Sequence, residues 1–129
     1  MATEGPLFHD GAQTTAASGD LAASQFYAVK LTGARVVDLA SAGGEPIYGI
    51  LQNTPLAGQA ADIGILGVSK AAAGAAFAAG AQLMTDTTGR LITATSTNHR
   101  VAVALEAAGA AGQIVTVALG SIGNAPAAA

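Results

Sequence analysis

Residues 100–119 read RVAVALEAAGAAGQIVTVAL, two β-type runs separated by a stretch of Ala and Gly. Side chains alternate across a strand, so each run presents one set of residues to each face of a sheet. The larger apolar sets are Val101, Val103 and Leu105 in the first run and Val115, Val117 and Leu119 in the second. We expect these two sets to form the core of an all-β domain.

The opposite faces of the two runs are small and almost uncharged. They carry Ala102, Ala104, Thr116 and Ala118. A strand with one face in water usually shows polar residues there. These faces are therefore buried inside the domain, covered by another subunit, or simply tolerated at the surface, where apolar atoms are common. We take the four residues as candidate contacts with a second protein chain.

Further β-type runs extend from this pair toward the N-terminus. They alternate with Gly, Pro, Asn and Asp at a spacing typical of strands and turns. The expected strands cover residues 25–32, 35–39, 46–52, 62–70, 81–86, 90–95, 100–106 and 113–119. A helix competes only at Ala71–Ala79, but Gly74 interrupts that stretch and so short a helix is marginal. The pattern predicts a small β-barrel or β-sandwich.

The chain also contains an internal repeat. The matching segments, in the same order, are LTG (31–33) and TTG (87–89), RVVDLAS (35–41) and RLITATS (90–96), PIYGIL (46–51) and RVAVAL (100–105), and AGQAADIGILG (57–67) and AGQIVTVALG (111–120). This order predicts two similar halves, about 25–67 and 81–120, inside one β domain that spans residues 21–120. The alternative, that all hairpins look alike in a chain rich in Ala and Gly, stays open from sequence alone.

Residues 1–20 are small and polar and show neither helical nor strand periodicity. We expect an extended N-terminal arm there and a flexible C-terminal tail at 121–129. Leu7 and Phe8 stand between segments rich in Gly and Pro, where nothing local can bury them. Such an arm can lodge in a neighbour's groove and become ordered on binding. Leu7, Phe8 and His9 are therefore candidate interface residues.

The composition limits the partners. The length of 129 residues fits one domain, and only 10% of the residues are charged, against roughly 25% in an ordinary soluble domain. The formal net charge is −3 and no cluster of Lys and Arg exists to neutralise phosphates, so we expect no binding to nucleic acid. The absence of cysteine excludes disulfides and thiol nucleophiles.

The chain shows no sign of membrane targeting. The N-terminus MATEGPLFHDG has neither the positive charge nor the apolar stretch of a secretory signal, which favours synthesis in a cytoplasm. The uncharged stretch after Glu106 is long enough to span a bilayer, but Gly, Asn and Pro interrupt it. We expect no membrane span.

The residues that could carry chemistry are scattered. His9 lies in the arm and His99 in a turn, where solvated loop histidines are the simpler interpretation. No two carboxylates have a spacing typical of a reaction centre. Asp86–Gly89, DTTG, is typical of a turn and lacks further ligands for calcium. We expect no enzyme activity, no metal and no cofactor; an enzyme site between subunits would have only Asp38, His99 and Arg100 to use.

A second hypothesis is a carrier module of the biotinyl or lipoyl kind, which is also a duplicated small β fold. Such a carrier needs an exposed Lys at a hairpin tip, usually flanked by Met. Lys30 lies within an expected strand and Lys70 at the end of another, and neither is flanked by Met1 or Met84. The carrier, or another small β binding module, is the alternative function.

One longer pattern has a familiar order. FYAVKLTG, VVDLAS, PIYGILQNTPLAGQAADIGILGVSKAAAG, AAGAQLMTDTTGRLITATS and VALEAAGAAGQIVTVAL follow one another over roughly residues 21–120. This order resembles the capsid cement, or head decoration, proteins of tailed bacteriophages. The resemblance implies a β-barrel or β-sandwich that assembles, often as a homotrimer, on the outer capsid surface of the virion. Its partner there is the major capsid protein, and it implies neither catalysis nor a cofactor.

Overall fold

The structure, a computed structural model, describes residues 2, 5–11, 14–16, 21–95 and 98–124. These residues form strands and no helix, so the expected all-β class is confirmed. The strands are β1 (Leu7–His9), β2 (Thr14–Ala16), β3 (Ala28–Gly33), β4 (Val36–Leu39), β5 (Gly49–Leu51), β6 (Ala60–Ala61), β7 (Ile63–Ala72), β8 (Gln82–Thr85), β9 (Leu91–Thr93), β10 (His99–Ala104) and β11 (Ile114–Asn124).

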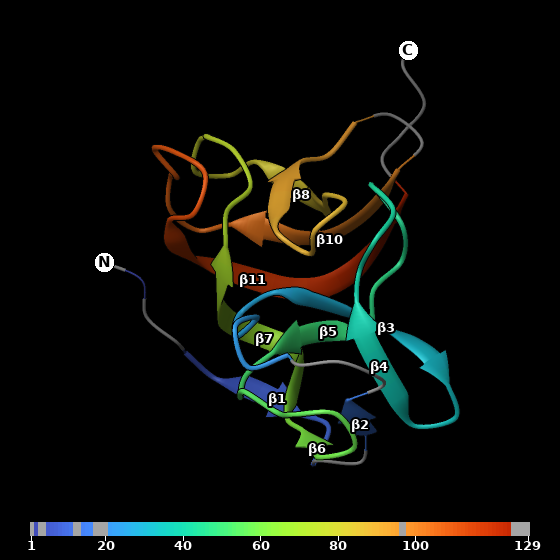
Figure 1. The fold of residues 1–129 in the computed structure, drawn as a ribbon. Helices are drawn as coiled ribbons and strands as arrows, with labels where there is room; N and C mark the ends of the chain where they lie inside the picture. The colour runs from blue at the N-terminus through green and yellow to red at the C-terminus, as the bar shows by residue number, and fades with distance from the viewer. Residues whose placement is uncertain (1, 3–4, 12–13, 17–20, 96–97, 125–129) are drawn as a thin grey trace.

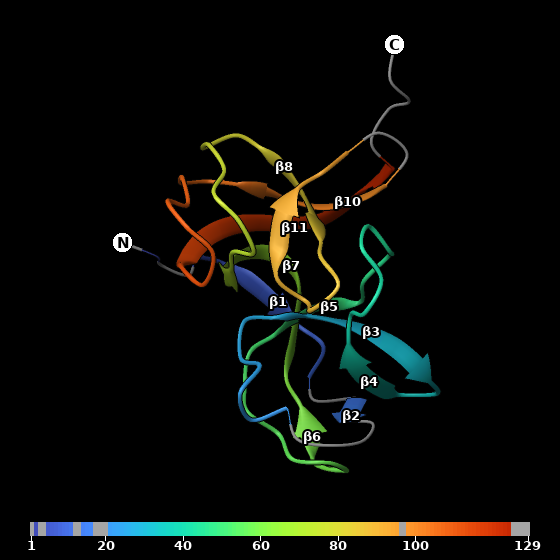
Figure 2. The same cartoon turned by 45° about the horizontal axis from the view of Figure 1, so that its top comes forward.

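The strands form one sheet in the order β6-β2-β4-β3-β5-β7-β11-β10-β8-β9, with β1 added beside β7. Every named pair is antiparallel except β2 with β4. Figure 1 shows the sheet curling on itself, with β8, β10 and β11 above and β2, β4 and β6 below. In Figure 2 the β3–β4 hairpin projects sideways from the body. The curled sheet therefore has one end built from β8, β10 and β11 and another built from β2, β4 and β6.

Strand pairing follows the same plan at both ends. The equivalent residue pairs are Val29–Leu39 and Leu83–Thr93, Ala28–Ile50 and Gln82–Val103, and Leu51–Ile63 and Ala104–Val117. Strands β3, β4, β5 and the start of β7 thus correspond to β8, β9, β10 and β11. The strand order reads as one half followed by the reverse of the other. The fold therefore consists of two similar halves.

The turn before the last strand of each half is also the same. Both turns have the sequence AGQ, at 57–59 and 111–113. Gly58 and Gly112 have φ values of 78° and 90°, a region that residues with a side chain rarely adopt. Gln59 Oε1 accepts a hydrogen bond from Leu56 N at 2.8 Å, and Gln113 Oε1 accepts one from Gly109 N at 2.7 Å. The AGQ motif is thus the local cause of the turn.

Each half begins earlier than the sequence pattern indicates. Ala16 N donates to Gln59 O at 3.0 Å, and Ala73 N donates to Gln113 O at 2.8 Å. Strand β2 lies parallel to β4, and Ala73 lies parallel to Leu91 of β9 in the same way. We therefore name residues 14–66 the first unit and residues 71–120 the second unit. Residues 14–16 were expected in an arm without strands, but they form β2. The sequence carries no local signal for this strand, because it pairs in parallel with a segment far along the chain.

The segment before the first unit also joins the sheet. Leu7 pairs with Gly67, Phe8 with Leu66, and the register then shifts before His9. Gly67 has a φ of 117°, and a Cβ there would lie 2.2 Å from Pro6 O. Gly67 is therefore what lets this segment approach β7. Of the expected arm, residues 7–9 and 14–16 are strands, and residues 1, 3–4, 12–13 and 17–20 lie outside the described residues.

Each unit has its own core. The core of the first unit contains Ala16, Leu21, Val29, Val37, Leu51, Ala61 and Ile63. The equivalent residues of the second unit are Ala73, Phe77, Leu83, Leu91, Ala104, Val115 and Val117, and all belong to a second, larger cluster. That cluster also contains Ala28, Ala40 and Ile50 from the other face of the first unit. The first unit is therefore buried on one face by its own core and on the other by the second unit.

The predicted faces of β10 are right for Val101, which is buried in the core, and wrong for the residues that follow it. Ala102 and Ala104 are buried in the core, whereas Val103 is half-buried and Leu105 is exposed. The pairing register shifts between Arg100 and Ala102, where β10 has one residue and β11 has three. From Ala102 to Ala104 the side chains alternate, but the small residues lie inward, because alternation alone does not say which face of a strand is buried. Strand β11 keeps the expected alternation, with Val115, Val117 and Leu119 in the core. Residues 121–124, expected in the tail, belong to β11, and 125–129 lie outside the described residues.

Candidate docking surface

Glu45 is bound by the backbone of its own loop and by Lys30. The carboxylate of Glu45 accepts hydrogen bonds from Ser41 N at 2.6 Å and Ala42 N at 2.8 Å, and its Oε1 lies 3.4 Å from Lys30 Nζ. Partial burial disfavours ionisation, but the two N–H groups and Lys30 outweigh it and lower the pKa of Glu45. Among the described residues, no three His, Asp or Glu side chains come together as a metal site.

The DTTG motif forms the predicted turn between β8 and β9. Asp86 Oδ1 accepts hydrogen bonds from Thr88 N at 2.8 Å and Arg90 N at 3.0 Å. Gly89 supplies the positive φ, 87°, that closes the turn. The carboxylate of Asp86 is therefore occupied by the backbone of its own hairpin.

Neither lysine occupies the position that a biotinyl or lipoyl carrier needs. Lys30 lies in β3 and donates to Ser41 Oγ at 2.7 Å. Lys70 lies in β7, with its Nζ 5.6 Å from the centre of the Phe26 ring. Because neither lysine is at a hairpin tip, the structure does not favour the carrier alternative.

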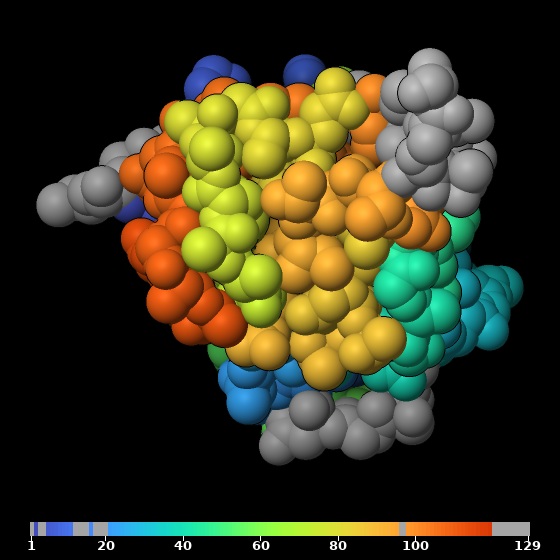
Figure 3. Space-filling model, turned by 90° about the horizontal axis from the view of Figure 1, so that it is seen from above, coloured from blue at the N-terminus to red at the C-terminus, as the bar shows by residue number. Residues whose placement is uncertain are grey.

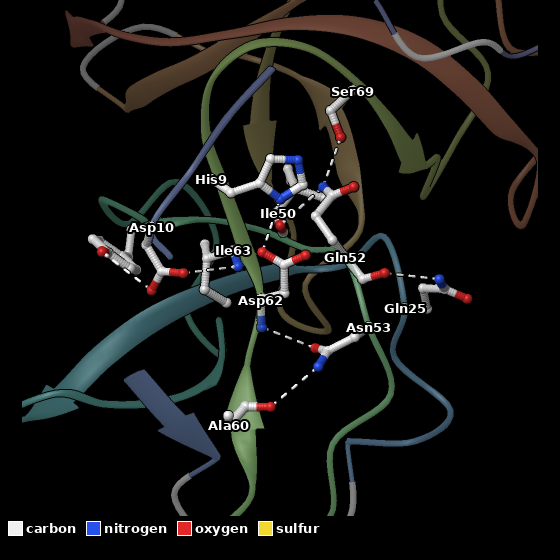
Figure 4. A network of polar contacts seen from close by, with 11 residues as sticks. His9, Asp10, Gln25, Ile50, Gln52, Asn53, Ala60, Asp62, Ile63 and Ser69 are labelled. Carbon is white, nitrogen blue, oxygen red and sulfur yellow. Dashed lines mark hydrogen bonds and ion pairs between the residues drawn. The ribbon is translucent and has the colours of Figure 1, made fainter. Parts of the chain in front are cut away.

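A network of polar contacts ties the N-terminal segment to the first unit (Figure 4). His9 Nδ1 lies 2.8 Å from Asp62 Oδ1, and Asp10 N donates to Ile63 O at 2.9 Å. The carboxylate of Asp10 accepts hydrogen bonds from Ile63 N at 3.3 Å and from the Tyr48 hydroxyl at 3.4 Å. Partial burial and the charge of Asp10 raise the pKa of Tyr48. His9 and Asp10 therefore anchor β1.

The β1–β7 pair presents large apolar side chains to solvent. Phe8 is 68% exposed, and Leu66, its direct partner on β7, is 51% exposed. Directly opposite residues of an antiparallel pair share a face of the sheet, so these two side chains are neighbours. We call Phe8 and Leu66 the Phe8 patch. An exposed aromatic residue held by a fixed backbone is typical of a contact surface.

A second open surface crosses the second unit. Gln82 pairs with Val103, Val103 with Ala118, and Ala94 N donates to Gln82 O, so these four residues form a row on one face. We call Ala94, Gln82, Val103 and Ala118 the open row, because each is half-buried or exposed. The equivalent row of the first unit is Ala40, Ala28, Ile50 and Gly64, and all four of its residues are buried. We call it the closed row.

The candidate interface residues fall into three groups. Phe8 lies in the Phe8 patch and Ala118 in the open row. Leu7 packs against the core and His9 anchors β1, while Thr116 is buried and its N donates to Glu106 Oε1 at 2.8 Å. The backbone hydrogen bond from Thr116 lowers the pKa of Glu106. Ala102 and Ala104 are buried in the core, which argues against the predicted contact with a second chain.

Sequence reasoning missed Leu66, Val103 and Ala94. A signal for Leu66 was present, because Ile65 and Leu66 are adjacent and strict alternation cannot bury two large neighbours on one face. Val103 was assigned to the core because it is larger than Ala102 and Ala104, and alternation alone does not say which face lies inward. Ala94 has no distinctive signal.

The phage cement protein family matches residues 9–119 of the chain. The chain therefore belongs to the phage cement protein family. The match runs from β1 into β11 and so includes both units. A cement protein is a structural protein of the phage particle, which is not an enzyme class.

Among solved structures, the chain is similar to the N base of the head fiber protein gp8.5 of bacteriophage phi29. The TM-score is 0.64 and the identity 18%, and the likeness covers 89% of this chain and 93% of that chain. At this identity the likeness shows a shared fold. No curated protein matches the chain. In the part of the chain that the structure describes, no helix is long and apolar enough to cross a membrane.

The family and the geometry agree on the class of function. As a phage cement protein, the chain is a structural protein associated with a phage capsid. The Phe8 patch and the open row are the two surfaces to test for contact with other polypeptides.

Proposed function

We propose that the chain binds the outer surface of an assembled capsid, built from the major capsid protein, and stabilises that capsid as a cement protein. It is made in the host cytoplasm and joins the virion from outside. The observation that carries the proposal is the Phe8 patch, in which an aromatic side chain is left 68% exposed on a well-anchored strand. We assign the contact with the shell to this patch.

The backbone under the Phe8 patch is held in place at both ends of β1. Asp10 and His9 hold one end of β1 through polar contacts, and Gly67 lets the other end lie close to β7. A surface that is already ordered loses less conformational entropy on binding than a flexible arm does. The Phe8 patch therefore keeps more of the free energy that it gains from burying apolar area.

Stabilisation follows from mass action. A protein that binds the assembled shell, and not its free subunits, adds its binding free energy to the assembled state. Full burial of a large apolar side chain contributes about 1.5–3 kcal/mol. A homotrimer presents three Phe8 patches, and multivalent attachment raises the effective affinity without a stronger single contact. No change of shape is needed.

The test is binding to shells that lack the protein. Leu66→Ser removes an apolar side chain from the Phe8 patch, and Leu56→Ser is the matched control, because Leu56 lies in the loop before β6 and is 49% exposed against 51% for Leu66. We expect wild type and Leu56→Ser to co-sediment with the shells and raise their heat tolerance. Leu66→Ser should bind at least about tenfold more weakly, the result of losing about 1.4 kcal/mol.

Equal binding by all three proteins would place the shell contact outside the Phe8 patch. Wild-type protein that neither co-sediments nor protects the shells would overturn the proposed function itself. Circular dichroism of each variant before mixing ensures that the comparison is made between folded proteins.

A further inference from the structure

The two units of the chain contact each other through specific surfaces. The β8–β9 turn of the second unit lies on the closed row of the first, where Ala28 N donates to Gly89 O at 2.6 Å. A Cβ on Gly89 would lie 3.0 Å from Ala28 O and 3.3 Å from Leu39 Cδ2, so the approach is close. Beside it, Gly44 N donates to Thr85 O at 2.9 Å. One hairpin of one unit thus seats on one face of the other.

The first unit has the same hairpin, and it lies open. Arg35 is the equivalent of Gly89 and shares its positive φ, at 58°. Leu31 is the equivalent of Thr85, yet Leu31 is 51% exposed and Thr85 is 0% exposed. The β3–β4 hairpin projects from the body in Figure 2, and Figure 3 shows blue-green atoms at the edge of the molecule beside the second unit. The β3–β4 hairpin thus has the same turn geometry as the hairpin that packs on the first unit, but the side chains of its tip are exposed.

The seat for such a hairpin is the open row of the second unit. Gln82 is the equivalent of Ala28, Ala94 of Ala40 and Val103 of Ile50. The open row keeps the uncharged character of the closed row, and none of its residues is Asp, Glu, Lys or Arg. Among the described residues, the β3–β4 hairpin therefore does not pack on a row of this kind, and the open row is not covered by a hairpin of this kind.

A hollow beside the β3–β4 hairpin strengthens the match. It is lined by Lys30, Leu31, Glu45, Pro46, Ile47 and Tyr48. The corresponding place on the second unit is already filled within the chain, because Gly44 lies there and makes backbone hydrogen bonds to Thr85 and His99. On the first unit the hollow is open, next to the exposed side chain of Leu31.

We infer that the β3–β4 hairpin of one copy of this chain docks on the open row of a second copy, repeating between chains the contact that joins the two units within one. The contact is heterologous, because two different surfaces meet, and such contacts build closed rings when the rotation closes. The inference deepens the proposed function by naming the surfaces through which the homotrimer forms. It leaves the Phe8 patch available for the shell.

The choice of a second copy rests on complementarity that the chain itself shows. The closed row accepts a hairpin of the same fold, with the same register and the same positive φ at its turn. An unrelated partner would have to reproduce that geometry, whereas another copy of the chain brings it in every molecule. In the proposed assembly, a hairpin and a row of the same fold therefore meet between molecules as they do between the two units.

The test is the oligomeric state of the purified full chain, without shells. Leu31→Glu places a charge on the hairpin and Val103→Glu places one in the open row, while Leu56→Glu is the control of matched exposure. By sedimentation velocity we expect wild type and Leu56→Glu to associate. Leu31→Glu and Val103→Glu should raise the dissociation constant by about 30-fold or more, the effect of losing a hot-spot residue of about 2 kcal/mol.

Mixing the two defective variants distinguishes a head-to-tail contact from other kinds. The hairpin of Val103→Glu is intact, and so is the open row of Leu31→Glu, so the mixture should form a 1:1 heterodimer that neither variant forms alone. If Val103→Glu does not fold, Ala94→Arg tests the same row. A wild type that is monomeric at all concentrations, a Leu31→Glu variant that sediments as wild type, or a mixture that stays monomeric would overturn the inference.

The outcome is separable from that of the proposed function. Association in solution is measured with no capsid present, and shell binding is measured through Leu66, which lies outside the hairpin and the open row. Loss of association in Leu31→Glu with unchanged association in Leu66→Ser supports the two separate surfaces. Loss of association in Leu66→Ser contradicts that separation.

Discussion

The first and second units share strand register, turn motif and core plan, yet they differ in what covers their sheets. Ile50 in the first unit is fully buried between the two units, whereas its equivalent Val103 is only half-buried in the open row. Similarly, Thr85 is fully buried and its equivalent Leu31 is half exposed. Two units joined head to tail bury one hairpin and one face and leave the other hairpin and the other face open. In a repeated fold, the surfaces that are covered in one unit therefore indicate which equivalent surfaces of the other unit a partner can cover.

The largest expected effect comes from truncating equivalent residues of the two rows. Ile50→Ala removes a fully buried side chain between the units and should lower the free energy of unfolding by about 3 kcal/mol, within the range for large-to-small core changes. Val103→Ala, in the half-buried open row, should cost less than about 1 kcal/mol in the monomer. Urea titration followed by circular dichroism measures both, and equal losses would remove the distinction between closed and open rows.

The next effect concerns the segment before the first unit. Gly67→Ala forces a Cβ to within 2.2 Å of Pro6 O at a φ of 117°, so it should cost about 2–3 kcal/mol and release β1. Gly112→Ala is the control, because its φ is 90° and a Cβ there meets nothing within 4 Å, and it should cost about 1 kcal/mol. Hydrogen exchange of the amides of β1 reports the release. Protection of β1 that matches wild type in Gly67→Ala would contradict the role of this glycine.

The two hairpins differ in how their turns are held. Asp86→Ala removes three hydrogen bonds to the Asp86 carboxylate, two from Thr88 and one from Arg90 N, and should cost about 1–2 kcal/mol. The equivalent Thr32 makes one long hydrogen bond to Val36 O at 3.5 Å, so Thr32→Ala should change stability by less than about 0.5 kcal/mol. Thermal melts compare the two variants, and a larger loss in Thr32→Ala would reverse the assignment.

The smallest expected effect is the dependence on pH that Glu45 gives the first unit and that the equivalent residue does not give the second. The pKa of Glu45 is lowered in the folded chain from an ordinary value of 4.5, so its stabilising contribution is present above about pH 4.5 and is lost as the pH falls through the folded-state pKa. The equivalent position in the second unit is Asn98, which does not titrate. Glu45→Gln should therefore reduce the stability difference between pH 7 and pH 3 by up to about 1 kcal/mol. Thermal melts at the two pH values give the difference, and an unchanged difference would mean that other carboxylates dominate.

Much of the fold was readable from local pattern. The runs from residue 25 to 119 coincide with strands to within a few residues, and the DTTG and AGQ turns are set by Asp and Gly in the positions that such turns require. The internal repeat was visible because each unit uses similar residues for the same turns. The first strands of the units were not visible, since β2 and Ala73 pair in parallel with segments far along the chain.

The candidate surfaces were predicted only in part. Phe8 was found because a large aromatic residue in a small, polar segment has nothing nearby to bury it. Ala102 and Ala104 were assigned to the wrong face because alternation does not say which face of a strand is buried, and the larger Val103 and Leu105 were taken as the inner set. Leu31 carried no signal, because half of a hydrophobic strand is always expected to be buried.

The sequence by itself determined an all-β chain with few charges and predicted two similar halves, because alternation, turn residues and composition are local or additive properties. The tertiary structure decided which faces of those halves are covered. That depends on long-range pairing, on which face of each strand lies inward, and on the second unit occupying the face of the first. Exposure is a property of the whole packed chain, and residues with the same local pattern, such as Ile50 and Val103, therefore differ in it.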